Sequence, residues 1–225
     1  MRRRWLDDDR DPLVLDALRA FTDGRGAGAA YALVRRHRGP IADNVAAAAL
    51  IVLGRLHRAE RRLARMDPAD VNYLVVVALR LLQGRDEEAW ALLAGYPVDY
   101  GVGLGGHTLA VALHRTGRDA VQVLGDVTGG RVFNGVAAGL FSERAYAEAL
   151  AWLSRGTEAV HAYDAACSCA RMGDGEAGLR WLSTALDRGW DDAGALDGDE
   201  DLASLRELPG WAAVRARLGD PSARR

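Results

Sequence analysis

The sequence contains no lysine, so all 29 of its basic side chains are arginine. It has two cysteines, Cys167 and Cys169, which are too few and too close together for the disulfide framework of a small secreted protein. No uninterrupted apolar run approaches the ~20 residues that a membrane-spanning helix needs. Residues 1–6 are basic, as in a signal peptide, but Asp7 to Asp9 follow where an apolar segment would be required. These absences predict a cytoplasmic protein.

Signatures of catalysis and of cofactor binding are also missing. The sequence has no Gly-x-Ser-x-Gly nucleophile elbow and no Walker phosphate loop. Three glycines between Gly101 and Gly105 imitate a phosphate-binding loop, but such a loop follows a strand, and no strand pattern lies nearby. A bend or a close contact between helices is the preferred interpretation of these glycines. We therefore expect neither an enzyme nor a cofactor.

The candidate metal ligands do not have the spacing of a metal site. A helix would separate His107 from His114 by ~10 Å along its axis, which is too far for both imidazoles to bind one ion. The acidic run 197–201 imitates the start of a calcium loop, but Leu202 stands where that loop needs glycine. No metal site is expected.

A repeat of about 30 residues runs along the chain. Gly24, Gly54 and Gly84 stand 30 residues apart, and an arginine follows each of them. Glycine is suited to end one helix, and a small residue and then a leucine follow where a second helix would pack against the first. The small residues are Ala29, Ala59, Ala89, Ala120, Ala149 and Gly178, and the leucines are Leu33, Leu63, Leu93, Leu124, Leu153 and Leu182.

The repeat predicts six helical hairpins and therefore an all-α fold. Pro40, Pro68 and Pro97 lie between hairpins, where a helix must end. The tail from Trp190 to Leu218 departs from the repeat, and its amphipathic run suits helices that cap a stack. We expect a single domain over residues 1–225, with an N-terminal tail (1–11), the hairpins (12–189), a C-terminal capping region (190–218) and a final tail (219–225). The paired segments are 13–22 with 27–38, 41–53 with 55–66, 72–82 with 87–94, 108–115 with 119–124, 131–141 with 146–155, and 160–172 with 176–188.

Two of these hairpins, 133–155 and 163–188, resemble the tetratricopeptide (TPR) family. Residues 185–211 are similar to the C-terminal ending of many bacterial TPR proteins. The resemblance implies a right-handed α-solenoid of about six TPR-like helix-turn-helix repeats with C-terminal capping helices. The unit of about 30 residues is shorter than the 34 of the family, and a chain without lysine cannot match the family's clamp of Lys, Arg and Asn for a terminal carboxylate. The matching positions of the second hairpin are Ala166, Gly173, Asp174, Gly178, Leu182, Ala185 and Leu186.

The resemblance also implies a concave groove lined by the first helix of each hairpin. A mostly apolar groove suits an amphipathic helix or an extended peptide of a protein partner. Because tyrosine and arginine are frequent anchors, Tyr163→Ala is expected to weaken partner binding without unfolding the protein. The first functional interpretation is a non-catalytic scaffold for protein–protein interaction. The expected groove residues are Asn44, Ile51, Leu74, Leu81, Asn134, Phe141, Tyr163 and Arg171.

An arginine-rich face supports an alternative interpretation. Residues 1–66 hold 14 arginines and 8 acidic residues, a formal charge of +6, whereas the rest of the chain carries −8. This asymmetry suits binding of nucleic acid, another polyanion or an acidic partner, or self-association through the acidic end of another copy. A solvated helix face on which arginine replaces lysine is the simpler explanation. The residues of this face are Arg35, Arg36, Arg55, Arg58, Arg62 and Arg65, with Arg61 beside them.

Overall fold

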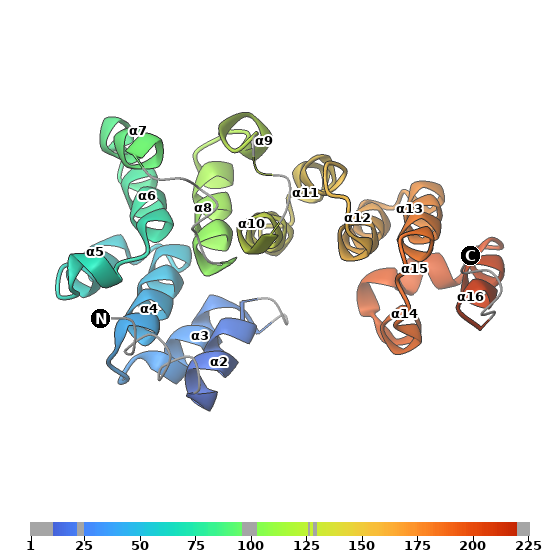
Figure 1. The fold of residues 1–225 in the computed structure, drawn as a ribbon, viewed down its shortest axis with the longest axis horizontal. Helices are drawn as coiled ribbons and strands as arrows, with labels where there is room; N and C mark the ends of the chain where they lie inside the picture. The colour runs from blue at the N-terminus through green and yellow to red at the C-terminus, as the bar shows by residue number, and fades with distance from the viewer. Residues whose placement is uncertain (1–10, 22–24, 96–102, 126, 128–129, 220–225) are drawn as a thin grey trace. The chain divides into compact units, whose positions relative to one another are not determined.

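The computed structural model describes residues 11–21, 25–95, 103–125, 127 and 130–219 (Figure 1). This part of the chain folds into α-helices, short 3-10 helices and turns, without a strand, so the predicted all-α class is confirmed. Contacts divide the chain into two compact units, Met1–Arg144 (unit 1) and Ala145–Arg225 (unit 2), which we describe one at a time. The single domain expected from the sequence stays a prediction. No helix within the described ranges is both long and apolar enough to cross a membrane.

Unit 1 consists of helices joined by short turns. Each hairpin segment predicted before residue 125 coincides with a pair of these helices. The fourth pair differs most from its prediction, because its first helix begins at Gly103 instead of residue 108. The helices are α2 (Pro12–Arg19), α3 (Gly26–Val34), α4 (Pro40–Val52), α5 (Leu56–Leu63), η1 (Pro68–Asp70), α6 (Tyr73–Leu82), α7 (Asp86–Gly95), α8 (Gly103–Arg115), α9 (Ala120–Val123) and α10 (Gly130–Ser142).

The core of unit 1 is built around α8, which packs against α4, α6 and α10. Figure 1 shows α6, α8 and α10 as neighbours in green. Residues Val45 to Ile51 of α4 and Gly105 to Leu113 of α8 are all buried. A helix that is apolar on every side belongs in the interior. The outer helix α5 instead buries only Ala59 and Leu63, which are four residues apart on one face.

Glycines allow α8 and α10 to approach closely. A Cβ atom on Gly106 would lie 2.5 Å from the carbonyl oxygen of Val132. A Cβ atom on Gly139 would lie 2.5 Å from the carbonyl oxygen of His107. The glycine-rich stretch at the start of α8 therefore serves close helix packing, which was one of the two interpretations preferred from the sequence. Gly101 lies outside the described residues.

The turns between paired helices share one geometry. Gly54 and Gly84 both have φ of +71°, Gly117 has +68° and Gly173 has +81°. At each turn the next amide closes onto the helix before it; for example, Arg55 N donates to the carbonyl oxygen of Leu50 at 2.7 Å. Gly24 lies outside the described residues. The equivalent position before α11 (Tyr146–Leu153) is Arg144 (φ +60°), the one described non-glycine residue with positive φ.

Unit 2 packs α12 between α11 and α13. The segment after α13 folds back onto α12 and α13, and its Leu202 and Leu205 are fully buried there. The two Cδ atoms of Leu205 lie 2.8 and 2.9 Å from the position that a Cβ atom would take on Gly178. Glycine at this position therefore leaves room for the Leu205 side chain of the C-terminal segment. The remaining helices are α12 (Ala159–Met172), α13 (Gly175–Asp187), α14 (Ala193–Gly198), η3 (Glu200–Leu202), α15 (Ala203–Arg206) and α16 (Trp211–Gly219).

Candidate functional site: an arginine surface on α5

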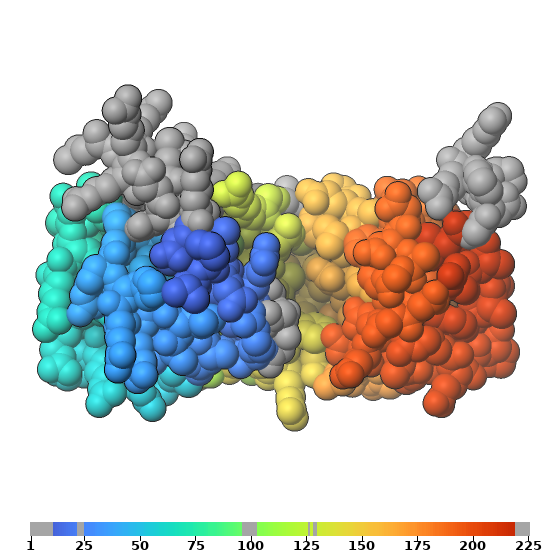
Figure 2. Space-filling view, turned by 90° about the horizontal axis from the view of Figure 1, so that it is seen from below, coloured from blue at the N-terminus to red at the C-terminus, as the bar shows by residue number. Residues whose placement is uncertain are grey.

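The outward side of α5 carries arginines at helical spacing. Arg58, Arg61 and Arg65 are exposed, and their intervals of three and four residues place them on one side of the helical path. Arg55, which precedes the helix, is exposed as well. We call Arg55, Arg58, Arg61 and Arg65 the arginine surface. The teal and cyan segment that includes α5 lies at the surface of unit 1 in Figure 2.

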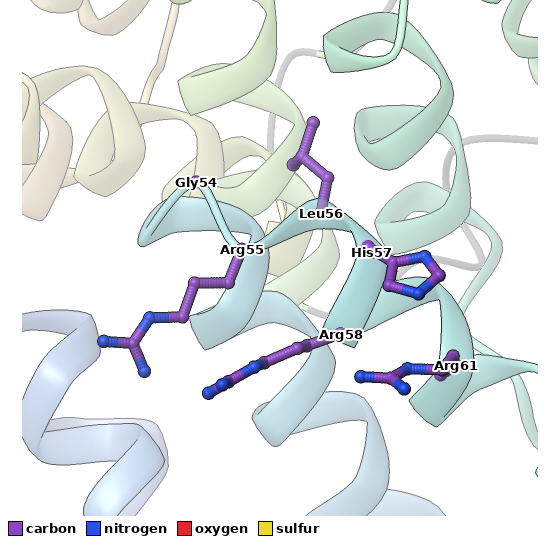
Figure 3. Close-up of a pocket in the computed structure, with 6 residues that line it drawn as sticks. All are labelled: Gly54, Arg55, Leu56, His57, Arg58 and Arg61. Atoms are coloured by element: carbon purple, nitrogen blue, oxygen red, sulfur yellow. The ribbon is translucent and has the colours of Figure 1, made fainter.

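An open hollow lies beside this surface. It has a volume of about 510 Å³ and is lined by residues 54–58 and Arg61. Figure 3 shows the guanidinium groups of Arg55, Arg58 and Arg61 on the same side of the ribbon, while Leu56 points away from them. An anion in this hollow would meet several guanidinium groups, which offer forked N–H donors suited to phosphate and carboxylate.

The four arginines differ from the carboxylate-matched arginines of unit 1. Among the described residues, Arg55, Arg58, Arg61 and Arg65 form no hydrogen bond or ion pair through their side chains, whereas several other guanidinium groups of the unit are matched by carboxylates. Glu60 is the acidic residue of α5, and its carboxylate is paired with Arg80, whose hydrogen bond lowers the pKa of Glu60. Glu60 therefore does not neutralise the arginine surface. The matched pairs of unit 1 include Arg25 with Asp16, Arg80 with Glu60, Arg85 with Glu88, Arg115 with Glu143 and Arg118 with Asp86.

Arg62 does not belong to the exposed face, and its assignment from the sequence is corrected. Its side chain is only 10% exposed and forms an ion pair with Asp43. Its guanidinium donates to the carbonyl oxygens of Arg35 at 3.2 Å and His37 at 2.7 Å. Arg62 therefore joins α5 to the connection between α3 and α4, in which the side chains of Arg35 and Arg36 are exposed. Helical spacing from Arg58 to Arg65 fits Arg61 and Arg62 equally well, so it could not show which of the two turns inward.

Five of the eight expected groove residues are interior residues. Ile51, Leu74 and Leu81 are at most 2% exposed and belong to the core of unit 1. Asn44 is buried too, and its amide donates to the carbonyl oxygens of Pro40 and Asp70, both at 2.8 Å. Their assignment as partner-contacting residues is corrected, because the neighbouring helices of the same chain already cover them.

Tyr163 is the fifth buried groove residue. Its ring stacks on Trp190 at 4.1 Å between centroids, and its hydroxyl donates to Asp199 Oδ2 at 2.9 Å. The expectation that Tyr163→Ala spares the fold is not compatible with this packing. Asn134 and Arg171 are exposed and Phe141 is partly exposed. Arg171 lies near Asp201, at 3.6 Å, and donates to the hydroxyl of Tyr146 at 3.3 Å.

No family model, curated protein or solved structure matches the chain. The interpretation of the site therefore rests on its own geometry.

Potential catalytic groups are buried in separate places. Burial lowers the pKa of His107 to about 4, and neither of its ring nitrogens has a hydrogen-bond partner. Burial raises the pKa of Cys169 to about 11 and raises that of Cys167 as well, so both thiols stay protonated at neutral pH. In the described ranges, no group of three His, Cys, Asp or Glu side chains could hold a metal ion.

Asp164 is a perturbed group that sequence reasoning missed. Burial on α12 and the carboxylates of Asp199 and Asp201 raise its pKa to about 7. Its place next to the expected groove residue Tyr163 on a mostly apolar helix was the available signal. The approach of Asp199 and Asp201 could not be read from the sequence, because it depends on how the C-terminal segment folds back onto α12.

Proposed function

We propose that this protein is a non-catalytic binding scaffold and that an acidic macromolecule docks on the arginine surface of α5. The observation that carries the proposal is the clustering of unpaired guanidinium groups around one hollow, in a unit where several other arginines are matched by carboxylates. A solvated face on which arginine merely replaces lysine would not require such clustering. An exposed cluster of one sign attracts the opposite charge and accelerates its association.

The proposal includes a TPR-like architecture, a right-handed α-solenoid of about six hairpins with C-terminal capping helices. Support comes from the recurring left-handed turns at Gly54, Gly84, Gly117 and Gly173. Further support comes from the small residues that open the second helices, since Ala59, Ala89, Ala120 and Ala149 are at most 2% exposed. Stacked repeats offer extended surfaces for partners.

A peptide in a concave groove is no longer the preferred partner, because most of the expected lining is core. A non-catalytic role agrees with the protonated, buried thiols and with the isolation of His107. The proposal keeps the cytoplasmic location expected from the sequence, where Cys167 and Cys169 would remain free thiols.

The test is binding of the full chain to three acidic probes: heparin, poly-glutamate and a DNA duplex. Wild type is compared with Arg58→Glu/Arg61→Glu, which reverses two charges at the hollow. The matched control is Arg131→Glu/Arg180→Glu, which reverses two exposed charges elsewhere. At least one probe should bind wild type and the control alike and lose most of its affinity for the α5 variant. Equal binding by all three proteins, or no binding of any probe at low salt, would refute the proposal.

A further inference from the structure

We infer that the acidic macromolecule is a nucleic acid, held on the arginine surface by its phosphodiester backbone. The inference rests on the proposed function, which an acidic protein would also satisfy. Two properties separate the two partners: the charge density of the surface and the lack of an apolar anchor among the residues that line its hollow. The lack of Phe, Tyr and Trp in that lining bears on the form of the nucleic acid.

The charge density matches a linear polyphosphate. Arg58 and Arg61 are three residues apart on α5, about 4.5 Å along the helix axis at 1.5 Å per residue, and Arg55 and Arg65 lie just beyond its two ends. The surface thus presents about one positive charge every 4–5 Å along the helix. A nucleic acid strand carries one phosphate per ~3.4 Å of helix axis. Each guanidinium group could therefore meet its own phosphate along one strand, with two N–H donors directed at the phosphate oxygens.

The surface has no centre suited to a protein partner. Stable protein interfaces use a desolvated core of aromatic or aliphatic anchors surrounded by a polar rim. Among the residues that line the hollow, Leu56 is the one with a large aliphatic side chain; it is partly buried and points away from the guanidinium groups (Figure 3). Interfaces with nucleic acid are instead polar and strongly positive, as this surface is.

The hollow also lacks Phe, Tyr and Trp. Proteins that hold unpaired bases stack them on such rings. Contacts from the arginine surface would thus fall on the backbone, which both a duplex and a single strand provide. We expect a duplex to bind at least as tightly as a single strand of the same length.

The experiment is fluorescence anisotropy of a labelled 20-base-pair DNA duplex of mixed sequence with the full chain. Neutralising about four phosphates gives a slope of about −3.6 for log K against log salt, so affinity should fall about 100-fold between 50 and 200 mM salt. Arg58→Glu/Arg61→Glu should reduce the steepness by about 2. Arg131→Glu/Arg180→Glu should keep the wild-type slope.

A second probe separates the two partners. Poly-glutamate with the same total charge as the duplex is titrated under the same conditions, and we expect it to bind at least tenfold more weakly. Equal or tighter binding of poly-glutamate, lost in the α5 variant, would overturn the nucleic-acid inference while the proposed function stands. Duplex binding that the α5 variant retains with an unchanged slope would overturn both.

Discussion

The carbonyl oxygen of His107 lies 2.5 Å from the position that a Cβ atom would take on Gly139. Helices α8 and α10 thus cross with their backbones almost in contact. The neighbouring position Gly106 faces the carbonyl oxygen of Val132 in the same way, also at 2.5 Å. The atoms in the way belong to the backbone, so a side chain cannot be accommodated by a change of rotamer.

Gly139→Ala should therefore destabilise unit 1, by about 1–3 kcal/mol or more, because the helices must separate to admit a methyl group. Gly28→Ala is the matched control. Gly28 lies in α3 with nothing within 4 Å of its Cβ position, so alanine there should raise stability by about 1 kcal/mol through its higher helix propensity. Urea unfolding followed by far-UV circular dichroism measures both. Equal midpoints for the two variants would show that the crossing is not tight.

The same crossing shows how far the sequence could predict the fold. The hairpins were predictable, because a turn glycine and apolar residues at helical spacing are local signals. The first turn of α8 was not, since Gly103, Gly105 and Gly106 have low helix propensity. These glycines stabilise the fold by allowing another helix to approach closely, and this contact exists only in the folded protein.

The candidate site was predictable to a similar extent. Composition indicated the arginine-rich face, and Arg55, Arg58 and Arg65 are exposed there. Sequence could not show that Arg62 turns inward, because its partners are two carbonyl oxygens of a preceding connection and Asp43. The groove residues were misplaced for a related reason. An apolar stripe on a helix does not say whether the same chain or a partner covers it.

His107 should make unit 1 sensitive to acid. Its pKa is about 4 in the folded protein, against an ordinary value of 6.5, because burial disfavours the charged imidazole and outweighs the opposing effect of Glu143. As pH falls from 6.5 to 4, the unfolded chain takes up a proton that the folded protein does not, so stability decreases by up to about 3 kcal/mol. Above pH 6.5 the imidazole is neutral in the folded and the unfolded state, so the stability that is lost in acid is fully present there.

Urea midpoints of wild type and His107→Leu at pH 7 and pH 4.5 measure this effect. The variant should lose much less stability than wild type between these values. If His107→Leu loses as much stability as wild type between pH 7 and pH 4.5, His107 is not the group responsible.

Arg62 and Arg58 should respond differently to the same substitution. Arg62→Ala removes the closer ion pair of Asp43, which then keeps only Arg38 at 3.8 Å, and removes the donors to Arg35 and His37, so we expect a loss of about 2–4 kcal/mol. Arg58→Ala removes an exposed, unpaired side chain and should change stability by less than about 0.5 kcal/mol. Urea unfolding tests stability, and anisotropy with the labelled duplex should show the opposite order of effects, with binding weakened by Arg58→Ala. A stability loss for Arg58→Ala as large as that for Arg62→Ala would contradict the separation of the two roles.

Tyr163 provides the corresponding test in unit 2. Tyr163→Ala should cost about 3–5 kcal/mol, because it empties a buried position stacked on Trp190. Tyr163→Phe keeps the ring and removes only the hydroxyl that donates to Asp199, so its cost should be about 1–2 kcal/mol. Urea unfolding of the full chain, with Tyr146→Phe as a control for a partly exposed ring on α11, distinguishes these effects. If Tyr163→Ala unfolds with the wild-type midpoint, then the ring does not support the interior of unit 2, and the residue could again serve a partner.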